Sequence, residues 1–283
     1  MVKSFKRGDF MPKLLCSTGA LVGRACNYDF SLIEKHIPAL ISDNLICGME
    51  FMMIPYYYDH LNEVAQTVIR SCAPVPVIHC EKDVGVLLSD CSSESTSKSF
   101  ELFKINCELG QKFSSKKMVF HLWGGVKSDF NVDYNISKLD KFINIAKSYN
   151  LTLLVENIPC TTHSGMKNWL KILSQLPAVD FTFDTRFGAF HDEIPEILQS
   201  STVWEHIKHI HISDYSSYPR DFSKIRPILH PGEGVIDFNY IFSKLRARNY
   251  THTITLESPV MQPDGIDLEK LKKSLAYIKN NLW

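Results

Sequence analysis

The sequence lacks the long apolar segments that would place it in a membrane. Nowhere in its 283 residues do about 18 apolar residues run together, which is the length that a membrane-spanning helix needs. The first ten residues carry basic side chains, and no apolar stretch follows them, so a secretory signal peptide is not expected. These two absences predict a protein that does not contact a membrane, and the reduced thiols expected of its cysteines suit the cytoplasm.

Several motifs tied to particular functions are absent as well. The eight cysteines form no C-x-x-C pair, which argues against a zinc knuckle or a thioredoxin-like site and favours reduced, mostly buried thiols. The segment Ser17–Arg24 matches no G-x-G-x-x-G phosphate loop. Positive charge is not in excess, because 31 Lys and Arg balance 31 Asp and Glu. This balance argues against a nucleic-acid partner.

The chain does contain a regular alternation of short apolar runs with longer stretches of helical spacing. The predicted strands are Leu14–Val22, Ile46–Met53, Val75–Glu81, Lys117–Trp123, Leu151–Asn157, Val179–Thr185, Ile207–Asp214 and Thr251–Ser258. The predicted helices are Asp29–Asp43, Asp59–Cys72, Glu94–Ser114, Ile136–Tyr149, Ser164–Leu176, His191–Ser200, Asp237–Arg248 and Asp267–Asn280. Strands that alternate with helices imply right-handed crossovers and a parallel sheet. Eight such repeats in about 280 residues predict an α/β protein with a (β/α)8 TIM barrel in a single domain, residues 1–283. An open doubly wound sheet is the alternative.

Polar residues end several of the apolar strands. Glu156, Asp184 and Glu257 lie at the ends of the fifth, sixth and eighth strands, and His211 lies in the seventh. In a barrel these ends converge on one mouth, where three carboxylates would repel one another and lose hydration. One divalent ion relieves this cost, and the ligand set suits Mn²⁺, Mg²⁺, Co²⁺ or Zn²⁺. Alone, each residue would more often be a cap, an ion-pair partner or a core histidine; the joint pattern predicts the metal.

The segments around these residues resemble the xylose isomerase-like TIM-barrel superfamily. The matching segments are Leu153–Asn157, Phe183–Thr185, His209–Asp214, His230–Asp237 and Thr255–Ser258. The Pro-Gly-Glu-Gly turn within His230–Asp237 is the most distinctive of them. The resemblance implies that Glu156, Asp184, His211 and Glu257 bind the metal, and that Glu156 and Glu257 also transfer protons.

The resemblance alone leaves two branches open, sugar isomerases and epimerases on one side and apurinic-site endonucleases on the other. Histidines at the positions of His79 and His121 bind a second zinc ion in the endonucleases and contact substrate in the sugar enzymes, and both roles stay open here. The endonucleases also carry a histidine three residues after the strand-six aspartate, and an Asp-x-His pair before the Gly-Glu-Gly turn. Those positions hold Phe187, Arg226 and Ile228. These departures favour the sugar branch.

We therefore expect a metal-dependent isomerase or epimerase of a sugar or a sugar-like polyhydroxy carbonyl compound. One of the two glutamates would remove the proton next to the carbonyl and the other would return it, with the metal stabilising the enediolate. An inosose-type dehydratase would use the same parts, and a zinc-dependent apurinic-site endonuclease is the other alternative. The sequence is compatible with a homo-oligomer and does not determine the oligomeric state.

Three further residues are candidates for contact with the substrate. Trp123 follows His121 and could stack on a sugar, Arg220 lies in the long loop after strand seven and could hold a phosphate or carboxylate, and Glu50 could line the mouth. A core tryptophan, a solvated arginine and a glutamate paired with a loop lysine are the corresponding structural explanations.

Overall fold

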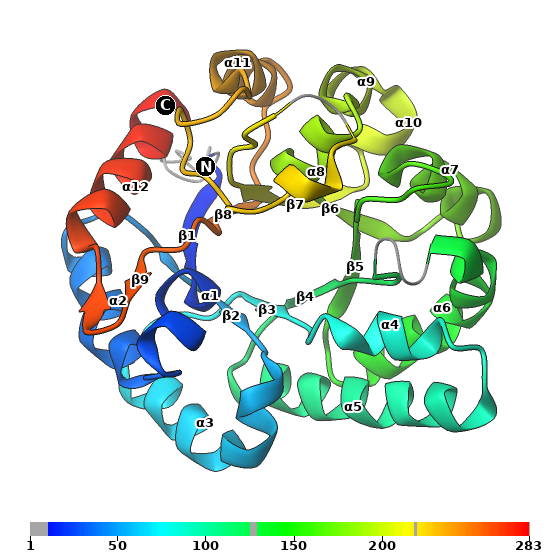
Figure 1. Cartoon of the computed structure of the whole chain (residues 1–283), viewed down its shortest axis with the longest axis horizontal. Helices are drawn as coiled ribbons and strands as arrows, with labels where there is room; N and C mark the ends of the chain where they lie inside the picture. Colours follow the sequence, from blue (N-terminus) through cyan, green and yellow to red (C-terminus); the bar gives the residue numbers. More distant parts are fainter. Residues whose placement is uncertain (1–10, 125–128, 218–219, 283) are drawn as a thin grey trace, which may run out of the picture.

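Eight parallel strands close into one barrel, which confirms the predicted fold. The structure is a computed structural model that describes residues 11–124, 129–217 and 220–282. The strands follow one another around the ring in chain order, and β8 pairs with β1. Figure 1 looks onto this ring, with the helices packed around its outside. The strands are β1 Lys13–Ser17, β2 Gly48–Met52, β3 Val77–His79, β4 Lys117–Phe120, β5 Thr152–Glu156, β6 Asp180–Asp184, β7 Ile207–Ile212 and β8 Thr253–Leu256.

Helices connect the strands, and most of them lie where the sequence predicts them. The helices of the described residues are α1 Thr18–Leu21, α2 Ser31–Ser42, α3 Leu61–Arg70, α4 Asp83–Leu88, α5 Ser93–Lys112, α6 Val132–Ser148, α7 Gly165–Gln175, α8 Thr185–Phe190, α9 Ile194–Gln199, α10 Ser201–Trp204, α11 Phe238–Ala247 and α12 Leu268–Leu282. The sequence did not predict α1, α4, α8, α10 or the small hairpin of β9 Met261–Gln262 and β10 Gly265–Ile266.

Two predicted elements are wrong in extent, each because a capping side chain redirects the backbone. The first strand ends at Ser17 rather than Val22, since the Ser17 hydroxyl accepts from Gly19 N at 3.1 Å and starts α1. The predicted helix His191–Ser200 is α-helical only over α9, and the separate helices α8 and α10 lie just before and just after the predicted range. Pro195 lies at the start of α9, and the Ser200 hydroxyl caps α10 by accepting from Val203 N at 3.1 Å.

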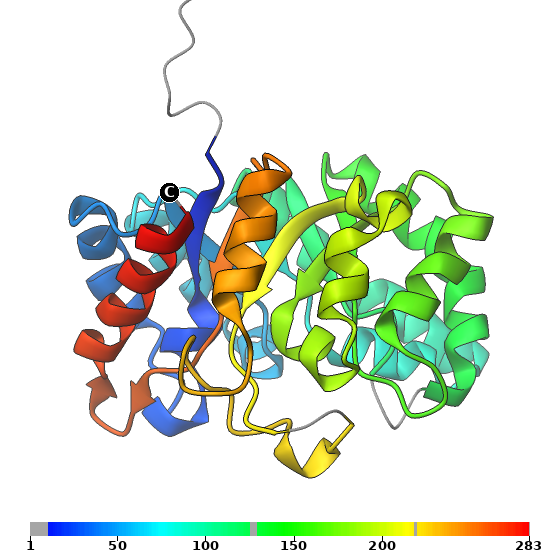
Figure 2. The same cartoon turned by 90° about the horizontal axis from the view of Figure 1, so that it is seen from above.

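The carboxyl ends of the strands share one face of the barrel. The side view in Figure 2 shows the long loop between β7 and α11 hanging beyond this face, on the side opposite the start of β1. Within the barrel, Leu15, Val77 and Val119 pack together as a small buried cluster. Among the described residues, none of the helices combines the length and the apolar character that crossing a membrane requires.

Lys117 lies at the start of β4, near the end of the barrel that is opposite the mouth. Its Nζ donates to the carbonyl oxygen of Lys208 at 2.7 Å and to Thr253 Oγ1 at 3.2 Å. Burial lowers the pKa of Lys117 to about 8, and Asp180 offsets only part of that effect. The folded protein therefore disfavours the charged form of this side chain.

We expect this buried lysine to make stability rise with pH. Between about pH 8 and 10.5 the unfolded chain keeps the Lys117 proton while the folded chain has lost it, so the free energy of unfolding increases with pH. The total is roughly 3 kcal/mol, because each pKa unit corresponds to about 1.4 kcal/mol. Urea unfolding at pH 7 to 10 should show this rise relative to Lys117→Met. The exposed neighbour variant Lys116→Met should track the wild type, and parallel curves for all three proteins would contradict the expectation.

Candidate metal centre

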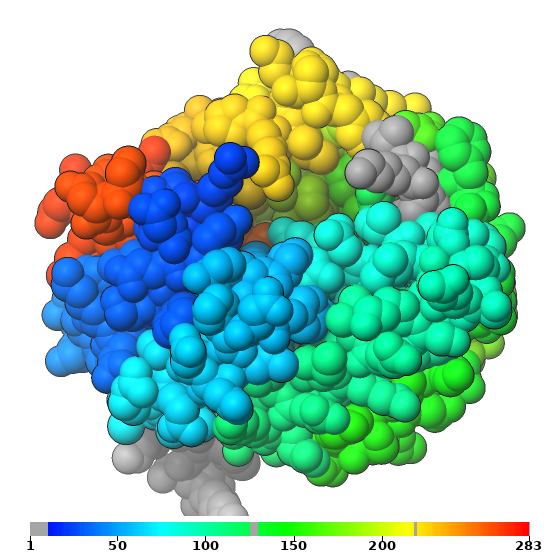
Figure 3. Space-filling view, turned by 60° about the horizontal axis from the view of Figure 1, so that its bottom comes forward, coloured from blue at the N-terminus to red at the C-terminus, as the bar shows by residue number. Residues whose placement is uncertain are grey.

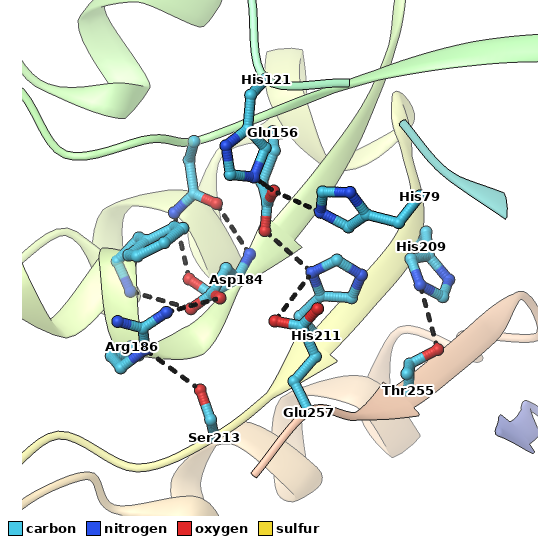
Figure 4. Close-up of polar contacts among 12 residues, drawn as sticks. His79, His121, Glu156, Asp184, Arg186, His209, His211, Ser213, Thr255 and Glu257 are labelled. Atoms are coloured by element: carbon cyan, nitrogen blue, oxygen red, sulfur yellow. Dashed lines mark hydrogen bonds and ion pairs between the residues drawn. The ribbon is translucent and has the colours of Figure 1, made fainter. Parts of the chain in front are cut away.

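The four strand-end residues expected to share a metal ion lie together at the mouth of the barrel. Glu156 ends β5, Asp184 ends β6, His211 lies near the end of β7, and Glu257 directly follows β8. One ligand atom of each lies within 4.8 Å of those of the other three, and Figure 4 shows the side chains converging. All four residues are buried, with at most 7% of their surface exposed. The structure therefore brings together the residues that the sequence singled out.

Strand register and a helix cap aim these side chains. Asp184 stands opposite His211 in the β6–β7 ladder, so the two share one level of the barrel. Asp184 Oδ1 caps α8 by accepting from Phe187 N at 3.0 Å. The Asn157 side chain ties β5 to β6, because its Oδ1 accepts from Asp184 N at 2.7 Å and its Nδ2 donates to Asp184 O at 3.1 Å. Asp184 Oδ2 therefore faces the other three metal-ligating side chains, and no described residue donates a hydrogen bond to it.

The four metal-ligating side chains carry more negative charge than the hydrogen-bond donors around them neutralise. Burial raises the pKa of Asp184 to about 7; Arg186 offsets part of this rise, and the charges of Glu156 and Glu257 add to it. Burial lowers the pKa of His211, yet the surrounding carboxylates raise it well above its usual value. Glu257 Oε1, like Asp184 Oδ2, is buried without a hydrogen-bond partner in the described part of the chain. Such atoms are costly unless a cation faces them.

A divalent cation fits this group. His211 Nδ1 faces two carboxylates, at 2.8 Å from Glu156 Oε1 and 3.5 Å from Glu257 Oε2. Three carboxylates and one imidazole, with no thiolate, suit ions such as Mn²⁺, Mg²⁺, Co²⁺ or Zn²⁺. The oxygens of Asp184 and Glu257 that lack hydrogen bonds are the atoms that such an ion would satisfy.

His79 and His121 approach the same group from β3 and from the end of β4. Their Nε2 atoms lie 3.5 Å and 2.6 Å from Glu156 Oε2. His79 Nδ1 lies 2.7 Å from the carbonyl oxygen of Cys80; this oxygen can only accept, so the neutral ring presents a lone pair at Nε2. Burial lowers the pKa of His121 to about 3 in spite of the nearby Glu156. Together with Glu156 the two rings form a second set of metal-ligating atoms, able to take an ion or a substrate hydroxyl.

The structure corrects the expectation for Glu50, which lies beneath the mouth rather than at its rim. Glu50 is fully buried, and its Oε2 accepts from His209 Nε2 at 2.7 Å, from Thr255 Oγ1 at 2.8 Å and from His211 Nε2 at 3.2 Å. When His211 donates through Nε2, its Nδ1 is left to face the metal group. These hydrogen bonds make Glu50 a positioning residue for His211, and one of its oxygens also belongs to a third set of metal-ligating atoms, with His79, His211 and Glu257.

The same hydrogen-bonded column continues toward the opposite end of the barrel. His209 Nδ1 lies 2.6 Å from Thr253 Oγ1, the hydroxyl that also accepts from Lys117. Burial raises the pKa of Glu50, but His211 and His209 hold it well below its usual value. The imidazole at the mouth is thus supported by a continuous polar network through the barrel interior.

Trp123 and Arg220 do not lie where contact with a substrate was expected. Trp123 is completely buried, and its Nε1 donates to the carbonyl oxygen of Ile158 at 3.1 Å, so no ring face is open for a sugar to stack on. Arg220 is exposed and is not among the described residues that line the cavity at the mouth.

That cavity has a volume of about 360 Å³ and is lined by His121, whose Nε2 lies 2.6 Å from Glu156 Oε2. Figure 3 shows a hollow beside the cyan and yellow parts of the chain, both of which contribute lining residues. Phe187, Arg226 and Ile228 all line it. These are the positions at which the endonucleases carry additional ligands, and none of the three side chains here is a carboxylate or an imidazole. Sequence reasoning missed Arg186, which also lines the cavity; its signal was its place two residues after Asp184.

Fold and centre together define a (β/α)8 barrel with a buried carboxylate–histidine group at the carboxyl ends of its strands. The chain belongs to the family of xylose isomerase-like TIM barrels, whose sequence model matches residues 46–281.

Several known proteins are similar to this chain in sequence or in structure. An uncharacterized protein of Methanocaldococcus jannaschii, MJ1311, is 26% identical over 169 residues, which are 56% of this chain and 54% of that protein. The match thus spans about half the length of this curated relative. The 3-keto-D-glucoside 4-epimerase YcjR from E. coli is 16% identical, with 95% of this chain and 99% of that chain covered at a TM-score of 0.65.

Two further solved structures are similar to this chain. An L-ribulose 3-epimerase is 15% identical over 96% of this chain and 95% of its own, with a TM-score of 0.70. The IOLI protein, solved with a bound zinc atom, is 17% identical over 95% of each chain, with a TM-score of 0.62. At these identities the likeness establishes the fold alone.

Proposed function

We propose that this protein is a metal-dependent isomerase or epimerase of a sugar or a sugar-like polyhydroxy carbonyl compound. The observation that carries the proposal is the placement of Glu156 and Glu257. They come from β5 and from the end of β8, and carboxylate oxygens of both lie within one buried group of ligand atoms. Two carboxylates that face one point from different strands can remove a proton from a substrate and return it.

The two glutamates differ in how they are held. Glu156 Oε1 lies 2.8 Å from His211 Nδ1 and its Oε2 lies 2.6 Å from His121 Nε2, whereas Glu257 Oε2 lies 3.5 Å from His211 Nδ1. Glu257 is therefore the less encumbered base. A divalent ion bound at the group supplies positive charge beside the substrate carbonyl, which makes the adjacent C–H more acidic.

The cavity and the relatives support this reaction over the cleavage of abasic DNA. Phe187, Arg226 and Ile228 leave no ligands for the additional zinc ion of the endonucleases. Two of the similar structures are sugar epimerases and a third binds zinc. A dehydratase acting on a related ketone would begin with the same proton removal, and its product would reveal it by loss of water.

The test is a metal count combined with hydrogen exchange in the wild-type protein. Protein stripped with a chelator and reloaded with Mn²⁺ should hold one ion per chain. In D₂O, with a panel of ketopentoses and ketohexoses that includes free, phosphorylated and carboxylated members, it should incorporate deuterium at the carbon next to the carbonyl of at least one of them, and the stripped protein should not. Two or three zinc ions per chain, together with cleavage of an abasic duplex and no deuterium incorporation, would sink the proposal.

A further inference from the structure

The cavity beside the metal group has mostly apolar walls, and positively charged side chains outnumber negatively charged ones along them. Its walls include Ile158, Phe187, Phe222 and Ile225. A cavity for a sugar alone would be expected to offer hydrogen-bonding side chains to hydroxyl groups around its wall, since orientation and specificity come from placed polar groups. Here the polar groups at the wall are mainly cations.

Three cationic side chains from three separate segments line this cavity. Lys82 follows β3, Arg186 lies in α8 and Arg226 lies in the loop after β7. Asp83 is the carboxylate among the described lining residues. Positive charge is therefore concentrated here in a chain whose 31 basic and 31 acidic residues balance overall.

Arg186 is held in place without using all of its donors. Its Nη1 donates to the carbonyl oxygen of Ile225 at 2.9 Å, and its Nε donates to Ser213 Oγ at 3.4 Å. The guanidinium also lies over the Phe187 ring, 4.4 Å from its centre. Nη2 is 3.9 Å from Asp184 Oδ2, which is too long for a hydrogen bond. Arg186 is only 5% exposed. Its guanidinium is therefore buried and fixed in orientation, and its Nη2 hydrogens remain available to a ligand.

We propose that Arg186, Arg226 and Lys82 form a subsite for an oxyanion, a phosphate or a carboxylate, carried by the substrate. A guanidinium presents paired N–H groups that match such an anion, and the pairing is strong where apolar walls exclude water. The substrate would then be an acidic sugar derivative rather than a neutral sugar. This inference rests on the proposed function only in placing the reacting end of the substrate at the metal group.

Ion-pairing of Arg186 with Asp184 does not account for the arrangement. Asp184 Oδ1 is engaged as the cap of α8, and the 3.9 Å separation leaves Nη2 without a hydrogen bond to the described residues. Arg226 is exposed at the cavity wall and has no ion pair among the described carboxylates. Three cations thus line a cavity to which the described residues contribute one carboxylate, that of Asp83.

The test is calorimetric binding of inorganic phosphate and of acetate to the Mn²⁺-loaded protein, in the absence of any turnover. We expect Arg186→Met to weaken binding of the preferred anion about tenfold or more, as loss of a charge-assisted pair implies. Arg186→Lys should restore part of the affinity. Arg226→Met and Lys82→Met should each weaken binding several-fold, and the tighter of the two anions identifies the group on the substrate.

Lys224→Met is the matched control, because Lys224 is an exposed cation on the same loop as Arg226 and does not line the cavity. Its anion affinity should equal that of the wild type. If Arg186→Met fails to fold, Arg226→Met at the exposed wall decides the matter. The subsite is refuted if neither anion binds the wild type, or if Arg226→Met and Lys224→Met behave alike. Failure of the isomerase proposal would instead appear as absent deuterium exchange, which this binding experiment does not measure.

Discussion

We expect Glu257→Gln to lower the turnover number by about 10²- to 10⁴-fold at saturating metal, the range typical of losing a general acid or base. Glutamine keeps the shape of the side chain and an oxygen that can contact a metal ion, but its amide cannot accept the substrate proton. Glu257 Oε1 has no hydrogen-bond partner in the described part of the chain, so the effect should come from lost proton transfer. Deuterium incorporation and turnover, both at saturating Mn²⁺, are the measurements.

A buried glutamate outside the metal group provides the control. Glu81 follows β3, is buried, and its Oε1 accepts from Asp83 N at 2.7 Å. It belongs to none of the three sets of metal-ligating residues. Glu81→Gln should therefore turn over at the wild-type rate. If Glu257→Gln turns over at the wild-type rate once Mn²⁺ is saturating, Glu257 is a ligand only and the proposed role of Glu257 in proton transfer is wrong.

The second large effect is expected at Glu50. Glu50→Gln should weaken metal binding by about 10- to 100-fold, the usual result of changing the group behind a metal-ligating histidine. The carboxylate accepts from His209, His211 and Thr255. The amide nitrogen of glutamine can only donate, so it would place a hydrogen opposite one of these donors and break that hydrogen bond. His211 then loses the acceptor that keeps Nδ1 toward the metal group. Titration with Mn²⁺ measures the affinity, and the visible spectrum of the Co²⁺ form reports the changed histidine.

Thr255→Val separates the orientation of His211 from general loss of polar contacts. This variant removes one hydrogen bond to Glu50 but leaves both histidines in place. We expect its metal affinity to fall by less than about tenfold, with an unchanged Co²⁺ spectrum. Equal losses in Glu50→Gln and Thr255→Val would mean that the column stabilises the barrel and does not orient His211.

Local pattern carried much of the fold and the outline of the site. All eight strands were predicted because each is a short apolar run followed by a helical repeat, and those patterns depend only on neighbours in the chain. Asp184 and Glu257 were found for the same reason, since an acidic side chain at the end of a buried strand breaks the pattern. Phe187, Arg226 and Ile228, located by counting along the sequence, do line the cavity.

The sequence did not predict how deep a side chain lies in the barrel. Glu50 and Trp123 both follow apolar runs and looked like groups at the mouth, yet one supports His211 from beneath and the other is completely buried. Depth depends on the register between neighbouring strands and on the tilt with which the sheet closes. Glu50, for example, stands opposite Val77 in the β2–β3 ladder, a pairing that neither segment specifies alone.

By itself, therefore, the sequence determined the alternating barrel and the polar strand ends Glu156, Asp184, His211 and Glu257. Only the tertiary structure decided what surrounds them. Arg186 reaches the cavity because Ser213 and Ile225, distant in sequence, accept its hydrogens. Glu50 meets His211 only across the closed ring. The pattern of a strand depends on residues that are close in the sequence. A counter-charge or a supporting carboxylate comes instead from a strand or loop that is distant in the sequence and becomes a neighbour only when the barrel closes.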